Sequence, residues 1–308
     1  GISIAVKKLL PIIFISSSAA LWGIIAIFVR KLTELGFTPM EIVTLRVFTA
    51  AVLLGILGIS KYPSQMKIKW MDIKLFIGTG VCSIVLFNWC YFSAINQMSL
   101  SIAVILLYTA PVFVTALSFL FLKEKMDTVK LLSVLGTIAG CVMVAGVNLH
   151  ATRFSFIGIL TGLGAGFGYA LYSIFGKFAL KKYQPFTVTF YTFVIASITL
   201  LPSTNIWEKG SLLVSNGVLL YGIGLGLIPT VLAYLLYTKG LEKVDTSKAA
   251  IIATVEPVVA TLLSVFLYRE GFSVTQGIGT SLILLSVLLV NRSKNNSNQL
   301  YEEKASIQ

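Results

Sequence analysis

Charged residues are scarce in this chain. Asp, Glu, Lys and Arg make up 12% of its 308 residues, about half the fraction of an ordinary soluble domain, while 56% of the residues are apolar. So few charges cannot cover the surface of a water-soluble globule. The composition therefore indicates an integral membrane protein.

The residues that build metal, redox and nucleotide sites are also few. The three cysteines, Cys82, Cys90 and Cys141, lie in apolar runs without C-x-x-C spacing, which indicates neither a complete disulfide framework nor a zinc site. The single histidine, His150, leaves no H-E-x-x-H motif, and there is no G-x-x-x-x-G-K-[ST] phosphate loop. We therefore expect no metal, no cofactor, no direct ATP drive and no catalytic residues.

Apolar stretches recur from the N-terminus to about Val290, each near the roughly 20 residues that a helix needs to cross hydrocarbon. The ten predicted spans, numbered in chain order, cover residues 9–29, 39–59, 74–95, 101–122, 131–148, 156–176, 186–203, 217–238, 249–268 and 276–291. The first run has no clear A-x-A-like cleavage site, so it is read as a span rather than a signal peptide. We expect an all-α integral membrane protein with ten transmembrane helices.

The basic residues predict how the spans are oriented. If the N-terminus is cytoplasmic, 18 of the 24 Lys and Arg residues fall in cytoplasmic segments and five on the opposite side, with Arg46 inside the second span. Lys and Arg are enriched in cytoplasmic loops of membrane proteins. We therefore expect a multi-pass protein of the cell inner (plasma) membrane with both termini cytoplasmic, and we read the net charge of +12 as orientation rather than as nucleic-acid binding.

The chain contains an internal repeat. Ala103–Glu124 (AVILLYTAPVFVTALSFLFLKE) matches Ala249–Glu270 (AAIIATVEPVVATLLSVFLYRE) at an offset of 146. Further residues align at offsets of 146 or 147: Tyr91 with Tyr237, Pro39 with Pro185, Trp22 with Tyr169, Phe28 with Phe175 and Arg30 with Lys177. Each half of the chain therefore contains five related helices.

Five is an odd number, so the second copy must enter the membrane from the opposite side. We divide the chain into a first repeat (1–148), a second repeat (149–292) and a polar cytoplasmic tail (293–308). Inverted repeats offer two nearly equivalent packings, one open inward and one open outward, around a binding site near the bilayer midplane. The repeat thus predicts transport by alternating access.

Several motifs resemble those of a known family. They are Ala20-Leu21-Trp22-Gly23, Leu45-Arg46, Tyr91 to Ala94, Pro111 with the Phe-Leu-Lys-Glu that ends at Glu124, and Glu256-Pro257 with Arg269-Glu270. In these the chain resembles the EamA-type ten-helix bacterial permeases of the drug/metabolite transporter superfamily, from about residue 10 to 291. The resemblance implies an exporter of amino acids, related metabolites or drugs, with a central cavity lined by helices 1, 3, 4, 6, 8 and 9. It leaves open a carrier that takes up choline or another quaternary ammonium compound.

Two charged residues, Arg46 and Glu256, lie well inside predicted spans, where a charge is costly unless it faces a cavity or a partner. Glu256 directly precedes Pro257, whose missing amide frees a carbonyl one turn earlier. Glu256 is a candidate for proton coupling or for binding a substrate ammonium group, or it is a structural carboxylate. Arg46 either pairs with Glu41 or a polar helix end, or it contacts a substrate carboxylate.

Aromatic and polar side chains predict the lining of the cavity. Asn88 and Tyr91 are three residues apart on one helical face, and Tyr169 and Tyr172 repeat that spacing. The full set of substrate-binding candidates is Trp22, Asn88, Trp89, Tyr91, Tyr108, Tyr169, Tyr172, Tyr234 and Glu256. Such rings suit an aromatic, aliphatic or quaternary-ammonium cargo. The alternative for any one ring is packing or an interfacial belt.

Three prolines, Pro111, Pro229 and Pro257, lie well inside spans and are hinge candidates, because each removes a helix hydrogen bond. The expected partners are a small-molecule substrate, the lipid bilayer and protons as a candidate coupling ion. A single chain can enclose a path, and a dimer is compatible with this. Two other classes, an intramembrane enzyme and a noncatalytic scaffold or receptor, remain as alternatives.

Overall fold

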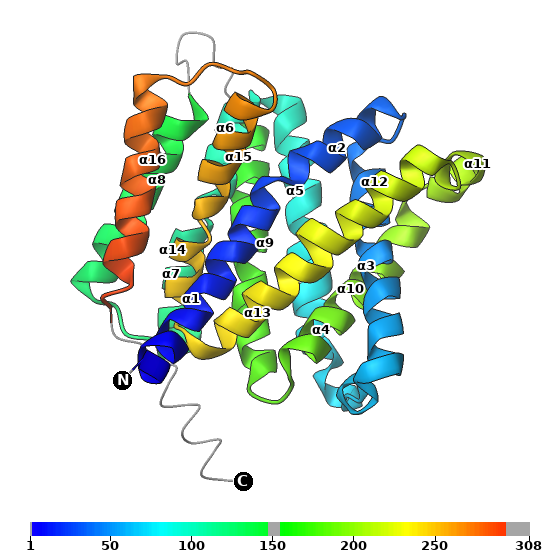
Figure 1. Cartoon of the computed structure of the whole chain (residues 1–308), viewed down its shortest axis with the longest axis horizontal. Coiled ribbons are helices and arrows are strands. Elements are labelled where there is room, and N and C mark those ends of the chain that lie inside the picture. Colours follow the sequence, from blue (N-terminus) through cyan, green and yellow to red (C-terminus); the bar gives the residue numbers. More distant parts are fainter. Residues whose placement is uncertain (1, 147–154, 294–308) are drawn as a thin grey trace.

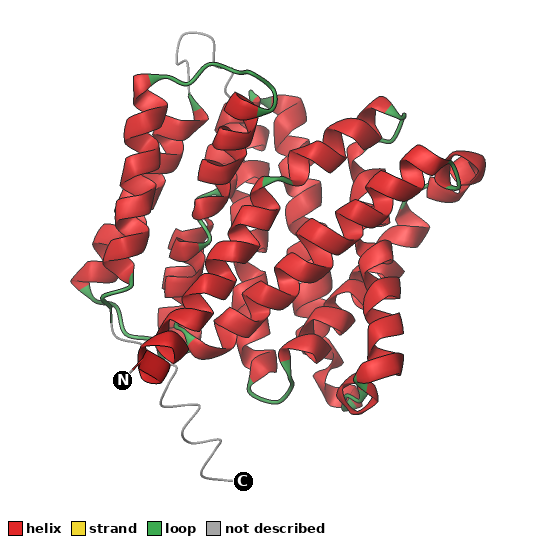
Figure 2. Ribbon diagram, in the orientation of Figure 1, coloured by secondary structure: helices red, strands yellow, loops and turns green. Residues whose placement is uncertain are grey.

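A computed structural model describes residues 2–146 and 155–293. The predicted repeat boundary at 148/149, His150 and tail residues 294–308 lie outside the described residues. Within the described ranges every regular element is a helix (Figure 2). The helices are α1 (Ile2–Gly23), α2 (Ile25–Glu34), α3 (Pro39–Lys61), α4 (Ile73–Ile77), α5 (Leu86–Gln97), α6 (Leu100–Leu107), α7 (Ala110–Phe121), α8 (Thr128–Ala145), α9 (Phe156–Leu180), α10 (Pro185–Ser203), α11 (Gly210–Leu213), α12 (Asn216–Gly226), α13 (Ala233–Lys243), α14 (Thr246–Ile252), α15 (Val255–Phe266) and α16 (Val274–Val290).

Five further segments are 3-10 or π-helical. The 3-10 helices are η1 (Pro63–Met66), η2 (Trp70–Asp72) and η4 (Ile206–Lys209), and the π-helices are η3 (Gly78–Val85) and η5 (Leu227–Leu232). Each π-helix joins two α-helices end to end, so that α4, η3 and α5 form one span, and α12, η5 and α13 form another.

The spans confirm the all-α membrane fold. Among the described residues, nine helices or helix series are long and apolar enough to cross a membrane, and Val274–Val290 is a shorter apolar helix of 17 residues. The nine are Ser3–Glu34, Pro39–Lys61, Trp70–Gln97, Leu100–Phe121, Thr128–Ala145, Phe156–Leu180, Pro185–Ser203, Asn216–Lys243 and Thr246–Phe266. We call these ten segments spans 1 to 10; they overlap the ten spans that hydropathy predicts.

Short polar motifs set the helix starts. Thr38 and Glu41 form a reciprocal capping box ahead of α3, with Pro39 at its first position. Asp127 accepts the Lys130 amide at 2.7 Å and so caps α8. Each cap satisfies amides that have no partner within the helix.

The two repeats interleave (Figure 1). Span 1 packs on spans 8 and 9, span 6 packs on spans 3 and 4, span 2 on span 7, and span 5 on span 10. The last pair approaches closely where glycines meet: a Cβ added to Gly140 would lie 2.7 Å from the Gly279 carbonyl oxygen. Helices of one repeat therefore pack largely against helices of the other.

Spans 4 and 9 are interrupted at equivalent places. The break between α6 and α7 is at Tyr108 and Thr109, and the break between α14 and α15 is at Ala253 and Thr254. The bounds of these four half-helices differ by 145 or 146 residues, close to the offset of the sequence repeat. Interrupted helices near the midplane form the binding sites of many inverted-repeat transporters.

The π-helices in spans 3 and 8 also overlap when one repeat is placed on the other. Residues Lys123 and Arg269, 146 apart, both adopt positive φ, 57° and 54°. The next residues donate to matching carbonyls, Glu124 to Ser118 at 3.2 Å and Glu270 to Ser264 at 3.1 Å. The repeat is therefore preserved in the backbone as well as in the sequence.

One end of the bundle contains the start of α1 and the end of α16 (Figure 1). Because the spans alternate in direction, the same end contains the Lys-rich links that include Lys125, Lys182 and Lys243. We call it the basic end and the other the opposite end.

Candidate substrate-binding site

The break in span 9 places a carboxylate inside the bundle. Glu256 is the second residue of α15, directly after the break. The Tyr169 hydroxyl donates to its Oε2 atom at 3.4 Å. A negative charge is favourable at a helix N-terminus. The carbonyl four residues before Pro257, that of Ala253, accepts the Glu256 amide at 3.1 Å, so it is used within the chain rather than left free as the sequence suggested.

An aromatic cluster lies beside this break. The buried Trp22 ring has its centroid 5.0 Å from Tyr234, 5.2 Å from Tyr237 and 6.4 Å from Tyr169. Tyr172 extends the cluster, with its ring centroid 5.1 Å from that of Tyr234. Spans 1, 6 and 8 therefore bring together four of the aromatic residues that the sequence predicts for the cavity, Trp22, Tyr169, Tyr172 and Tyr234.

Polar atoms in and around this cluster differ in whether they have a hydrogen-bond partner. The Tyr172 hydroxyl shares a hydrogen bond with Thr238 at 2.6 Å, and the Tyr237 hydroxyl shares one with Ser173 at 2.5 Å. Within the described part of the chain, Trp22 Nε1 and Ser83 Oγ are buried without a hydrogen-bond partner. A buried polar atom without a partner is costly and needs an explanation, such as a ligand.

Ser83 was missed in the sequence, where it is one small polar residue in an apolar span. It lies in the π-helix η3, where the winding differs from an α-helix. Such π-helical insertions are frequent at functional sites. Here η3 brings the Ser83 side chain to the same cavity as Trp22, Tyr169 and Tyr234.

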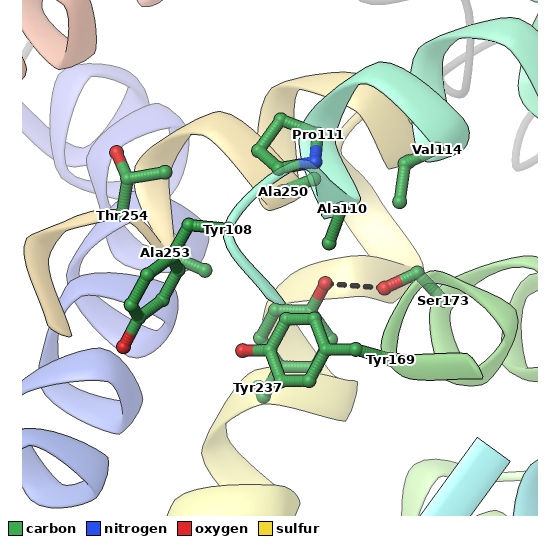
Figure 3. A pocket seen from close by; sticks show the side chains of 10 residues that line it. All are labelled: Tyr108, Ala110, Pro111, Val114, Tyr169, Ser173, Tyr237, Ala250, Ala253 and Thr254. Carbon is green, nitrogen blue, oxygen red and sulfur yellow. Dashed lines mark hydrogen bonds between the residues drawn. The ribbon is translucent and has the colours of Figure 1, made fainter. Parts of the chain in front are cut away.

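Two narrow cavities adjoin in this region. One is lined by Trp22, Ser83, Phe87, Tyr169, Tyr172, Ser173, Tyr234 and Tyr237. The second lies between the two helix breaks (Figure 3) and is lined by Tyr108, Ala110, Pro111, Val114, Tyr169, Ser173, Tyr237, Ala250, Ala253 and Thr254. Each has room for about one water molecule. A metabolite therefore requires the surrounding helices to move apart.

Arg46 lies on the other side of the aromatic cluster. Its Nε donates to Thr230 Oγ1 at 2.6 Å and its Nη2 donates to the Pro229 carbonyl at 2.8 Å. Pro229 has no amide to give the carbonyl of Leu225, and the Thr230 hydroxyl donates to that carbonyl at 2.8 Å instead. Arg46 therefore stabilises the π-helix η5. Its guanidinium carbon lies 5.8 Å from the Tyr234 ring centroid.

The alternative pairing of Arg46 with Glu41 is wrong. Glu41 Oε1 accepts Lys209 Nζ at 2.6 Å and the Thr38 amide at 2.8 Å, at the opposite end of the bundle. The partner is not a polar helix end either: Arg46 contacts a carbonyl and a hydroxyl of η5, in the middle of span 8.

Three predicted residues of span 3 lie outside both cavities. Asn88 is buried and donates its amide to the Ile84 carbonyl of its own helix at 2.8 Å. Tyr91 packs on Phe92, with ring centroids 5.6 Å apart. Trp89 is 56% exposed on the outside of the bundle, so its grouping with the cavity residues needs correction. Adjacent residues of a helix point about 100° apart, so Trp89 cannot share the inward face of Asn88.

The three hinge candidates all lie at irregular helix segments. Pro111 is in the first turn of α7 and Pro257 in the first turn of α15, each directly after a break. Pro229 lies within η5. Their positions agree with the sequence, and bending during transport stays a prediction.

These observations define a class of protein: a multi-pass membrane transporter with two inverted five-helix repeats and interrupted spans at its centre. The chain belongs to the EamA-like transporter family, whose model matches residues 9–146 and 156–292.

Curated relatives agree with this family. An uncharacterized transporter of Archaeoglobus fulgidus is 31% identical, and the alignment covers 89% of this chain and 94% of that protein. The uncharacterized transporter YwfM of Bacillus subtilis is 27% identical, with 91% and 93% covered. The uncharacterized inner membrane transporter YicL of Salmonella typhimurium is 24% identical, with 89% and 92% covered.

The fold also matches a solved crystal structure of a protein, with a TM-score of 0.75 and 20% sequence identity. The match covers 91% of this chain and 95% of that chain. At this identity the likeness concerns the fold alone.

Proposed function

We propose that the protein is a secondary transporter that exports amino acids or related small zwitterionic metabolites by alternating access. The observation that carries the proposal is that two opposite charges inside the bundle, Arg46 and Glu256, lie beside the aromatic cluster: Glu256 accepts the Tyr169 hydroxyl at 3.4 Å, and the Arg46 guanidinium carbon lies 5.8 Å from the Tyr234 ring centroid. An intramembrane charge is expensive and is retained where it serves a pathway or partner.

An amino acid complements this pair. Its ammonium group would bind Glu256, and its carboxylate would bind guanidinium N–H groups of Arg46 that remain after the bonds to Pro229 and Thr230. Trp22 Nε1 and Ser83 Oγ add a donor and a hydroxyl that have no partner in the described structure. The rings around them would enclose an aliphatic or aromatic side chain.

Glu256 is also our candidate for proton coupling. It sits at the N-terminus of α15, beside the break in span 9, and accepts a hydrogen bond from the Tyr169 phenol of span 6. A carboxylate that alternately binds a proton and a substrate ammonium group would link the two fluxes. Metabolite export from the cytoplasm would then be driven by proton entry.

A second candidate is a carrier that takes up choline or another quaternary ammonium compound. The aromatic rings of Trp22, Tyr169, Tyr234 and Tyr237 beside Glu256 support it, because such rings attract quaternary ammonium groups. Arg46 counts against it, since choline offers no carboxylate to balance that charge.

The test is counterflow in proteoliposomes preloaded with an unlabelled neutral, aromatic or cationic amino acid or with choline. For a cargo that exchanges, its amide and its N-acetyl derivative are added as competitors. Loss of one charge-assisted contact, about 1.5–3 kcal/mol, should weaken each derivative roughly tenfold to a hundredfold. Derivatives that compete as well as the parent amino acid would refute recognition of both charges.

The matched variants are Glu256→Gln and, as a control, Glu34→Gln, whose carboxylate is exposed and 3.8 Å from Lys31. We expect Glu256→Gln to weaken exchange and to abolish accumulation driven by a pH gradient, while Glu34→Gln behaves as the wild type. Full exchange and pH drive in Glu256→Gln would make Glu256 structural. Choline exchange without amino acid exchange would favour the second candidate.

For location, we propose the cell inner membrane with the basic end cytoplasmic. The distribution of Lys and Arg supports this orientation. One chain provides both repeats and both sides of the cavity, so we propose that a monomer suffices for transport.

A further inference from the structure

The basic end is closed where span 4 meets span 9. The half-helix α14 packs along α7, and all seven of its residues are buried. Glu124, which follows span 4 and is 6% exposed, caps α14: its carboxylate accepts the Thr246 amide at 2.7 Å and the Ser247 amide at 3.4 Å. A residue of the first repeat thus holds the start of a helix in the second repeat.

At the opposite end, the half-helices that correspond to α14 and α7 lack this close packing. The half-helix α6 corresponds to α14, and α15 corresponds to α7, yet α6 and α15 do not pack closely along each other. Of the eight residues of α6, Ala103 alone is buried, and Leu100, the equivalent of Thr246, is 59% exposed. The side chain of Ser99 does not cap α6.

Glu270, the equivalent of Glu124, is likewise free of α6. Its side chain is 55% exposed and meets Arg30 at 3.4 Å. The backbone that carries it matches that of Glu124, because the preceding residue is left-handed in both copies and both amides donate to equivalent serines. Glu270 therefore has the geometry to cap α6 if the two half-helices close.

A second pair of residues shows the same contrast. Lys177, at the basic end, donates to the carbonyls of Leu241 and Val244 at 2.6 and 2.7 Å and so caps the end of α13. Arg30, which aligns with Lys177, is instead exposed and stacks on Tyr268 with its guanidinium carbon 3.7 Å from the ring centroid. Two caps therefore hold the basic end closed, that of Glu124 on α14 and that of Lys177 on α13. The equivalent residues at the opposite end, Glu270 and Arg30, contact each other instead in the described structure.

We infer that Glu124 and Glu270 cap different half-helices in the two alternate conformations, and that each cap closes one side of the transporter. In the described conformation Glu124 caps span 9 and closes the basic end; in the other conformation Glu270 caps the N-terminus of α6 and closes the opposite end, while Glu124 releases α14. The inference rests on the proposed function in that it identifies the residues that close each side of the carrier.

One contact of the basic end has no counterpart. Lys130 Nζ donates to Asp245 Oδ2 at 2.8 Å, and both side chains are buried. The equivalent positions are Gln276 and Ser99, and Gln276 instead caps its own helix and contacts the Val144 carbonyl at 3.3 Å. This ion pair joins span 5 to the start of span 9 at the end that is closed in the described conformation.

The test uses cysteine pairs in the full chain, with Cys82, Cys90 and Cys141 replaced by alanine. Glu124→Cys with Thr246→Cys reports closure of the basic end, and Glu270→Cys with Leu100→Cys reports closure of the opposite end. A short bifunctional thiol reagent should link each pair, and a shift on a denaturing gel measures the yield without any knowledge of the cargo. The readout is therefore separate from failure of the proposed function.

We expect the Glu124/Thr246 pair to link readily and the Leu100/Glu270 pair to link more slowly. The two pairs should link in different molecules, because the two ends close in different conformations. In the second pair, adding Lys130→Met should raise the linked fraction, because it releases the basic end. Single variants are read with the cysteine pair at the other end: Glu124→Gln should raise linkage of the Leu100/Glu270 pair, and Glu270→Gln should raise linkage of the Glu124/Thr246 pair, each by about threefold to thirtyfold, the range for loss of a helix cap.

Two results would overturn the inference. The Leu100 and Glu270 cysteines would fail to link in both the wild-type and the Lys130→Met background, or both pairs would link at once in the same molecule. As a control for collision, Leu100→Cys is combined with Glu34→Cys, another exposed carboxylate position at the opposite end. Linkage of this control as fast as the Leu100–Glu270 pair would also count against a specific cap.

Discussion

The close approach of α9 to the break in span 4 depends on glycines, of which Gly166 lies against the break itself. A Cβ added to Gly166 would lie 2.5 Å from Thr109 Oγ1 and 2.7 Å from the Leu106 carbonyl oxygen. Ordinary contacts are about 3.5 Å, so Gly166→Ala forces α9 and the broken helix apart by roughly 0.8–1 Å. Overpacking of this kind costs about 1–3 kcal/mol.

The same helix offers a matched control. A Cβ at Gly176 would meet Leu241 Cδ2 at 3.6 Å, which is an ordinary contact. Gly176→Ala should therefore raise the free energy of unfolding by about 0.8–1 kcal/mol, the gain in helix propensity, without a clash. Gly166→Ala should show the same gain reduced by the overpacking cost. The two variants should differ by about 1–3 kcal/mol in the free energy of unfolding.

The assay is thermal unfolding in detergent, followed by tryptophan fluorescence. At roughly 2–4 °C per kcal/mol, Gly166→Ala should melt about 2–12 °C below Gly176→Ala. A melting temperature for Gly166→Ala equal to or above that of Gly176→Ala would refute the close packing of span 6 on the break.

Two further substitutions have definite expectations. Lys130→Met removes the 2.8 Å contact between Lys130 Nζ and the buried Asp245 carboxylate and should lower the free energy of unfolding by about 3–5 kcal/mol, as expected when one partner of a buried ion pair is lost. The double variant Lys130→Met/Asp245→Leu should recover most of this loss in thermal unfolding, and no recovery would contradict the pairing. Ser83→Ala breaks no hydrogen bond of the described structure, so it should leave stability within about 0.5 kcal/mol yet raise the KM for cargo in counterflow; an unchanged KM would remove Ser83 from the binding site.

Much of the fold could be predicted because the bilayer imposes simple rules. A crossing helix needs a long apolar run and its backbone must bond internally, so hydropathy located all ten spans within a few residues. The repeat of Ala103–Glu124 in Ala249–Glu270 identified spans 4 and 9 as equivalent helices, and Pro111 and Pro257 lie within three residues of the two breaks.

The rest depends on contacts between distant residues. In the sequence, Lys130 is one of the basic residues that indicate topology, yet in the structure it forms an ion pair with Asp245, 115 residues away. No local pattern indicates the π-helix that turns Ser83 toward Trp22, and hydropathy could not tell that Trp89 faces outward. Arg46 was recognised as needing a partner, and the partner proved to be the backbone of η5.

In the proposed transport cycle, one cavity at the break in span 9 opens alternately to the two sides of the membrane. The most direct measurement is labelling of Thr254→Cys, in a cysteine-free background, by a membrane-impermeant maleimide in right-side-out and in inside-out vesicles. Thr254 is buried and lines the cavity between the two breaks. We predict labelling from both sides, slowed on both by the cargo that exchanges in counterflow; labelling from one side alone, or from neither, would contradict alternating access at this site.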